Sequence, residues 1–178
     1  MQQVLDLIKS RRSIRKFKSD AVPSDLVDKV VEAGLYAATG KNRQPCKIIV
    51  ITNEDLKAQI RALNAQIMGS KEGFDPFYGA PVYILVVAAK SAPTATYDGS
   101  LVLGNMMLAA HALGLGSCWI HRAKESMETP LYKDLFKSLG IEGDFEGIGH
   151  LALGYVSGDY PACPKRKENS VYYVKEVQ

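Results

Sequence analysis

The sequence predicts one folded domain of mixed helix and strand, of the α/β or α+β class. Its 178 residues are 47% hydrophobic and 23% charged, a balance that supplies a sizeable core and excludes disorder as the dominant state. Segments with helical spacing of apolar residues alternate with short β-branched runs, and no internal repeat interrupts them. We therefore expect a single domain over residues 1–178.

Helical spacing predicts three helices in the first part of the chain. The first is short and amphipathic and ends in the basic residues 9–12. The second spans about 24–37, with Ser24 as its N-cap. Asn53 is expected to cap the third, which runs up to Gly69. Each of these helices therefore has a boundary that can be checked.

A fourth helix is predicted over residues 96–113 and a fifth over 132–139. Because the fourth has almost no polar face, we expect it to be buried, in the core or at a subunit interface. β-Branched apolar runs predict strands at 48–51, 82–87, 117–120 and 150–155. The run at 82–87 is apolar almost throughout, which indicates a strand at the centre of the sheet, covered on both faces.

Three segments lack a regular pattern. Turn-rich composition predicts an ordered loop over 38–45 and an irregular segment over 69–80. Beyond the last strand, residues 156–178 contain one apolar stretch, 171–174. We expect this tail to wrap over the domain or to pair with a partner subunit.

Charge and cysteine content exclude several classes of protein. The 22 Lys and Arg against 19 Asp and Glu give a net charge of +3, too small to indicate a nucleic-acid or membrane partner. No apolar run approaches the roughly 20 residues of a spanning helix, and the first residues lack the order of a signal peptide, so we expect the mature chain to begin here. Cys46, Cys118 and Cys163 are odd in number and far apart, which favours a reducing, cytoplasmic compartment.

Most standard catalytic signatures are missing. The glycine pair in 114–116 follows a helix and precedes a strand, the reverse of the order in dinucleotide-binding motifs. The three histidines lack metal-ligand spacing, so we expect no metal site. Cys118 is more typical of a small core residue than of a nucleophile, and His111 of a hydrogen-bonded interior histidine.

Two basic clusters remain, and they are Arg11, Arg12, Ser13 and Arg15 near the start and Lys165, Arg166 and Lys167 near the end. Arginines on a strand-like stretch with an intervening serine can surround a phosphate dianion. Taken alone, each cluster is more typical of a solvated basic face, because short basic runs are common on surfaces.

At these residues the chain resembles the flavin-dependent nitroreductase family, in the right order over essentially the whole chain. Arg11, Ser13, Arg15 and Phe17 match its Arg-x-Ser-x-Arg/Lys-x-Phe motif. In the family these polar groups hold the phosphate and the ribityl chain of FMN. The basic run at 165–167 loosely matches the closing motif, and the resemblance places it on the same phosphate, with Arg12 beside it.

A second motif lies in the loop at 38–45. Asn42, Gln44 and Pro45 fit a Pro-Ser-Ser-x-Asn-x-Gln-Pro-like pattern, and Cys46 stands where a Trp usually follows. In the family this loop reaches the flavin that the other subunit binds. The resemblance therefore implies a homodimer with FMN sites at the interface, and the flavin-contacting candidates in this loop are Ala38, Thr39, Gly40, Asn42 and Gln44.

A third region, 114–122, is similar to the segment whose backbone passes the flavin ring and donates an amide to N5. By position the donor lies at His121 or Arg122, just after Ile120. Many relatives carry a small or acidic residue there. The His-Arg pair is thus expected to alter the flavin potential or the charge preference for substrates.

The resemblance implies an α+β nitroreductase-like fold with a central mixed, mostly antiparallel sheet flanked by helices, in an intertwined homodimer with a C-terminal extension. It also implies an oxidoreductase that moves hydride from NAD(P)H to FMN and then to a nitroaromatic, quinone or similar small-molecule acceptor in a ping-pong cycle. This scheme requires no catalytic side chain.

Two other classes of function remain open on the sequence. One is a flavin-binding module without reductase turnover, and the other is a basic nucleic-acid-binding domain, which the low net charge disfavours. Phe74, Phe77 and Tyr78 are candidates either for a lid over an aromatic acceptor or for local packing of the 69–80 segment.

Overall fold

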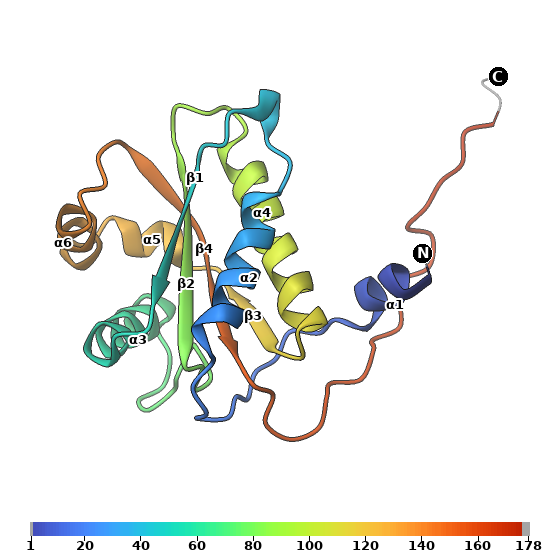
Figure 1. Ribbon diagram of the computed structural model, residues 1–178, viewed down its shortest axis with the longest axis horizontal. Coiled ribbons are helices and arrows are strands. Elements are labelled where there is room, and N and C mark those ends of the chain that lie inside the picture. Colours follow the sequence, from blue (N-terminus) through green and yellow to red (C-terminus); the bar gives the residue numbers. More distant parts are fainter. Residues whose placement is uncertain (1, 176–178) are drawn as a thin grey trace.

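The computed structural model describes residues 2–175, so Met1 and residues 176–178 of the predicted tail lie outside the described part. In chain order its elements (Figure 1) are α1 (Gln2–Ser10), α2 (Ser24–Leu35), the 3-10 turn η1 (Gly40–Asn42), β1 (Cys46–Ile51), α3 (Glu54–Met68), β2 (Val82–Ala89), α4 (Ala95–Ala112), β3 (Gly116–Ile120), α5 (Ala123–Met127), α6 (Pro130–Ser138) and β4 (Phe145–Gly154). No described helix is both long and apolar enough to cross a bilayer.

The four strands form one sheet in the order β1-β2-β4-β3, and every neighbouring pair is antiparallel. The expectation of a mixed sheet is therefore wrong for these strands. The parallel component is a single bridge, between Ser13 and Ser117 of β3. Through this bridge the stretch before α2 joins the sheet edge without becoming a full strand.

Helices cover both faces of the sheet (Figure 1), with α2 and α4 on one face and α3, α5 and α6 on the other. This arrangement explains why β2 is apolar at almost every position. Tyr83, Leu85 and Val87 point into the core under α3 and α6, whereas Ile84 and Val86 point toward α2 and α4. The prediction of a central strand buried on both faces is confirmed.

The α4 helix is only partly buried within one chain. Val102, Leu103 and Met106 are buried against the sheet. On the opposite side, Tyr97 and Leu101 are 73% and 50% exposed. The α4 helix is therefore not buried on all sides within the single chain. Tyr97 and Leu101 form an apolar strip that remains at its surface.

Helix boundaries agree with the sequence where a side chain forms the cap. The Asn53 side chain accepts a hydrogen bond from the Leu56 amide at 2.9 Å, and Gly69 ends α3 at φ 64°. The prediction of Ser24 as an N-cap is wrong, because Pro23 holds that position and Ser24 is already helical. The helix is started instead by the fixed φ of the proline.

The sequence underestimates β4 and misses α5. The strand begins at Phe145 rather than at His150, because Gly147 and Gly149 interrupt the apolar pattern of its first half. A Cβ at Gly147 would collide with the carbonyl oxygen of Ala123, so the glycine is what lets α5 lie against the strand.

The C-terminal tail leads away from the body of the chain (Figure 1), and residues 158–175 are exposed. The expectation that it wraps over its own domain is therefore wrong for this part. Its apolar stretch, Val171, Tyr172, Tyr173 and Val174, is 68–82% exposed. Pairing with a partner subunit stays a prediction.

Candidate functional site

The first basic cluster is fixed to the edge of the sheet. Ser13 forms its bridge with Ser117, and the Ile14 amide donates a hydrogen bond to the Ser117 carbonyl oxygen at 2.9 Å. Ile14 and Phe17 turn into the core, with 2% and 8% of their surface exposed. The polar residues around them are thereby held at the surface beside β3.

Within residues 2–175 the guanidinium groups of this cluster form no ion pair. Arg12 Nη1 donates to the carbonyl oxygens of Lys9 and Arg11, at 2.7 Å each. Arg11 Nη1 and Arg12 Nε are buried and have no hydrogen-bond partner among the described residues. A buried N–H group without an acceptor costs about 1–3 kcal/mol. The cluster is thus arranged to receive an acceptor from outside the chain.

A hollow of about 350 Å³ opens beside the cluster, and it is lined by Arg11, Arg12, Ser13, Arg15, Pro161, Ala162, Pro164 and Arg166. The lining combines four guanidinium groups with one hydroxyl and includes no carboxylate side chain. A phosphate dianion accepts forked hydrogen bonds from guanidinium groups and offsets their charge. The donor set of this hollow therefore fits a phosphate.

The second basic cluster meets the first through one residue. Arg166 lines the hollow, whereas Lys165 and Lys167 do not belong to its lining. Lys165 Nζ instead forms an exposed ion pair with Glu168 at 3.1 Å. A phosphate-binding role for these two lysines stays a prediction.

Tyr160 joins the tail to this site, a role that no pattern in the sequence indicated. Its hydroxyl accepts a hydrogen bond from the Arg12 amide at 3.0 Å and lies 3.1 Å from Nδ1 of His111. Nε2 of the same imidazole lies 2.8 Å from Oγ of Ser10. His111 is therefore hydrogen-bonded as expected, but it is half-buried at a junction of α1, α4 and the tail rather than interior.

The loop at 38–45 is ordered, and it contains the η1 turn. Lys41, Asn42 and Gln44 adopt left-handed backbone, with φ of 54°, 53° and 48°. This region costs a non-glycine residue roughly 1–2 kcal/mol. Residues 41–44 are nevertheless exposed, so packing of their side chains does not explain the strain.

Hydrogen bonds donated to a buried carboxylate hold this loop in place. Asp98 of α4 is 3% exposed, and it accepts from the Gly40 amide at 2.9 Å and from Oγ1 of Thr94 at 2.8 Å. The Gln44 amide donates to Oγ1 of Thr39 at 3.1 Å. A Cβ on Gly40 would collide with the Thr94 side chain, so only glycine fits there.

Neither core cysteine beside the site is prepared for nucleophilic chemistry. Burial, assisted by the Asp98 carboxylate, raises the pKa of Cys46 to about 11. Burial also raises the pKa of Cys118, although the charges of Arg15 and Arg11 oppose it. Both side chains thus stay thiols near neutral pH, which agrees with the prediction of Cys118 as a core residue.

The turn after β3 directly follows the edge strand to which the basic cluster is hydrogen-bonded. Ile120 is buried, His121 is exposed and Arg122 is half-buried. Three residues of β3 lie between Ser117, beside the cluster, and His121, and the four steps along the chain span about 13 Å. The edge strand β3 therefore connects the side of the sheet that holds the arginine-lined hollow to the turn predicted to face the flavin ring.

The lid hypothesis is wrong for Phe77. Its side chain is fully buried, and its ring stacks on Tyr83 with centroids 3.9 Å apart. Phe74 is 39% exposed and contacts Tyr78 edge to face at 6.1 Å. For these two residues the lid stays a prediction.

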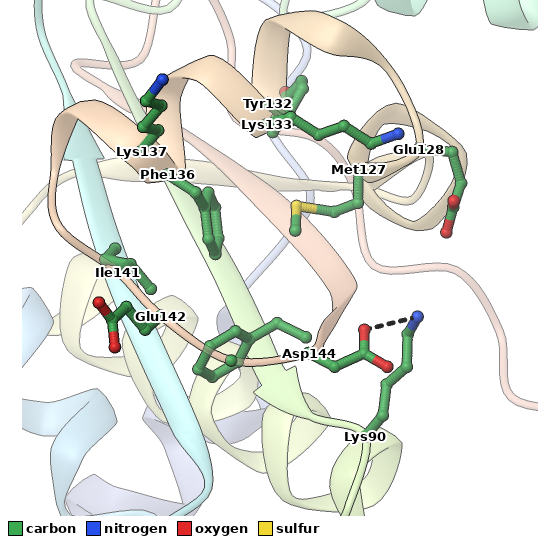
Figure 2. A pocket seen from close by; sticks show the side chains of 12 residues that line it. Lys90, Met127, Glu128, Tyr132, Lys133, Phe136, Lys137, Ile141, Glu142 and Asp144 are labelled. Carbon is green, nitrogen blue, oxygen red and sulfur yellow. Dashed lines mark ion pairs between the residues drawn. The ribbon is translucent and has the colours of Figure 1, made fainter.

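A larger hollow, of about 480 Å³, lies between α5, α6, the end of β2 and the start of β4 (Figure 2). Met127, Phe136 and Phe145 supply apolar surface, and an ion pair of 2.9 Å joins Lys90 to Asp144 at its edge. No residue of the sequence-predicted site lines it. Size alone therefore does not identify the functional site of this chain.

Comparison with known proteins agrees with the resemblance found in the sequence. The Nitroreductase family model matches residues 8–155. A nitroreductase with bound FMN from Bacteroides fragilis superposes with a TM-score of 0.87 at 28% identity, covering 98% of this chain and 100% of that one. Another with bound FMN, from Desulfitobacterium hafniense, gives 0.85 at 25% identity with the same coverage.

Two proteins with similar sequences are named for different activities. A protein of Methanothermobacter thermautotrophicus, named for NADH dehydrogenase and NAD(P)H nitroreductase activity, is 33% identical over 65% of this chain, and the match spans 59% of its own length. An iodotyrosine deiodinase of Thermotoga neapolitana is 26% identical over 94% of this chain and 96% of its own.

Proposed function

Because this chain belongs to the nitroreductase family, we propose that it is an FMN-dependent oxidoreductase that takes hydride from NAD(P)H and reduces nitroaromatic, quinone or similar electron-poor acceptors in a ping-pong cycle. The observation that carries the proposal is the convergence of four arginines and Ser13 around one hollow, with two guanidinium nitrogens buried and unpartnered. Such a donor set suits a phosphate dianion better than any neutral ligand.

The residues of the chain have separate tasks in this scheme. When bound, the flavin supplies the hydride chemistry. Arg11, Arg12, Ser13 and Arg15 hold the phosphate, with Arg166 closing from the tail. The backbone at 121–122 presents an amide dipole toward the ring, which stabilises negative charge there because the dipole is already oriented.

We further propose a homodimer with the two sites at its interface. The apolar strip on α4, Tyr97 and Leu101, is exposed in the single chain, as are Leu35 and Tyr36 at the end of α2. Exposed apolar surface of this kind is typical of a subunit contact. The strained loop at 38–45 would then be held by Asp98 in a shape that serves the partner's flavin.

The test is a visible spectrum of the purified protein, repeated without oxygen after NADH and then NADPH. We expect flavin bands that bleach with a nucleotide and return when a nitroaromatic or a quinone is added. Flavin bands that persist with both nucleotides would indicate a binding module without turnover. A colourless protein that fails to take up added FMN would overturn the proposal.

A further inference from the structure

We propose that Arg122 selects acceptors carrying a carboxylate or another anionic group, and that the buried Tyr132–His150 pair positions its guanidinium. The inference rests on the proposed function, because Arg122 gains this task only beside a bound flavin. It names the substrate class that the site favours.

Arg122 offers an uncompensated positive charge at the turn after β3. Its side chain is half-buried, and Nε is buried without a hydrogen-bond partner. No ion pair in residues 2–175 includes it. A guanidinium that is partly desolvated and unpaired attracts an anionic group more strongly than one in free solvent.

A buried pair lies close to this turn, since His150 of β4 is the strand partner of Ile120 at the end of β3. His150 is fully buried, and its Nε2 lies 2.6 Å from the hydroxyl oxygen of Tyr132. Burial first, and then the charge of Arg122, lower the pKa of His150 to about 3. The imidazole is thus neutral at physiological pH, and the charge of Arg122 is close enough to act on it.

The unpartnered atoms of Arg122 and His150 are complementary. Nδ1 of His150 is buried without a partner, as is Nε of Arg122. If the imidazole carries its proton on Nε2 and donates it to Tyr132, Nδ1 becomes an acceptor that one water can join to the Arg122 Nε–H. We assign this tautomer, because the alternative would turn an N–H donor on His150 Nδ1 toward the N–H donor of Arg122.

The backbone of Arg122 is held from the same interior. Oγ of Ser126 donates to the Arg122 carbonyl oxygen at 2.7 Å, and Nδ2 of Asn64 donates to that Oγ at 3.3 Å. The ring of Tyr132 forms part of the wall of the larger hollow (Figure 2), while its hydroxyl meets His150. The main chain of Arg122 is therefore fixed, which sets the point from which its side chain extends.

The first test measures binding of two non-reducible probes, benzoate and benzamide, to the oxidised holoprotein by flavin absorbance. They share a ring and differ in charge. We expect benzoate to bind about 10- to 100-fold more tightly, the range of one charge-assisted hydrogen bond. Arg122→Gln should abolish this ratio, Arg122→Lys should keep part of it, and Lys133→Gln, which removes an exposed cation on α6, should keep all of it.

The second test asks whether the buried pair acts through Arg122. Tyr132→Phe retains the ring, and we expect it to lower the benzoate-to-benzamide ratio by less than Arg122→Gln does. Both variants should lower the midpoint potential of the bound FMN, because a fixed cation favours reduced flavin. A purely structural role of Tyr132 would change neither the probe ratio nor the potential.

Failure of this inference differs from failure of the proposed function. A yellow protein reduced by NAD(P)H whose probe ratio is unchanged in Arg122→Gln, or is lost in His121→Asn instead, overturns the role of Arg122. An unchanged ratio and potential in Tyr132→Phe overturns the positioning step. A protein that binds no FMN overturns both proposals.

Discussion

Arg11, Arg12 and Arg15 are carried by a stretch that is hydrogen-bonded to β3, whereas Arg166 is carried by a tail whose residues 158–175 are exposed. The first stretch contributes two buried side chains to the core, Ile14 and Phe17, which lie on either side of Arg15. The tail is held near the site by Tyr160, through the Arg12 amide and His111. Two clusters of similar composition thus differ in how firmly the fold holds them.

This difference separates a preorganised half of the site from an adjustable one. Groups fixed before binding lose little conformational entropy when a ligand arrives. Ordering of exposed tail residues costs about 1–2 kcal/mol per residue for the backbone alone. The core-held arginines should therefore contribute most of the affinity, and the tail should close over a ligand that is already bound.

The largest effect is expected where the core holds the first cluster. Ile14→Ala removes a side chain that is 2% exposed, and it should lower the free energy of unfolding by about 2–5 kcal/mol. FMN affinity should fall as well, although no ligand-binding group has changed. Chemical denaturation and a fluorescence titration with FMN would measure the two effects.

Val50→Ala is the control for this variant, since Val50 is 42% exposed on the edge strand β1. It should change stability by about 0.5 kcal/mol or less and leave FMN affinity as it was. Equal losses in the two variants would mean that the arginines do not depend on the core.

The second comparison removes one guanidinium from each half of the site. Arg11→Gln should weaken FMN binding by about 10- to 100-fold, because a charge-assisted hydrogen bond contributes about 1.5–3 kcal/mol. Arg166→Gln should cost less than tenfold, since ordering of the tail offsets part of its contribution. Lys18→Gln removes an exposed cation outside the hollow and serves as the control. Equal losses at Arg11 and Arg166 would contradict the division into two halves.

Local patterns explain which parts of this fold could be predicted from the sequence. Continuous apolarity placed β2 at the centre of the sheet, and Asn53 marked the start of α3. The first half of β4 was not recognisable, because Gly147 and Gly149 are needed for close approach of Ala123 and Trp119 and leave no apolar alternation to read.

The site divides in the same way. Arg11, Ser13 and Arg15 lie within five residues of one another, so the resemblance of this short motif to the family pattern could select them. Asp98 and Tyr160 could not be selected, because each acts on residues far away in the chain: Asp98 on the Gly40 amide and Tyr160 on the Arg12 amide. A buried carboxylate or an exposed tyrosine has no signature until the fold brings its partner to it.

A smaller effect is expected when the hydrogen bonds of Tyr160, which connect the tail to the core-held arginines, are weakened. Tyr160→Phe keeps the ring stacked on His111, where the centroids are 5.6 Å apart, and removes the hydroxyl. The free energy of unfolding should fall by about 0.5–1.5 kcal/mol. Hydrogen exchange should rise in residues 158–175, and Arg166→Gln should cost little further FMN affinity in this background. Tyr172→Phe alters a tyrosine that is 82% exposed and should have neither effect.

The smallest expected effect is a pH dependence of the contact between Tyr160 of the tail and His111. Burial, then the charges of Arg11 and Arg12, lower the pKa of His111 below its ordinary 6.5. The unfolded chain therefore binds the proton more readily, so the contribution of His111 to stability is complete above pH 6.5 and is lost as pH falls through the lowered value. Limited proteolysis of the tail should accelerate between pH 7.5 and pH 5. His111→Gln should remove this dependence, and acceleration that persists in the variant would assign it to other groups.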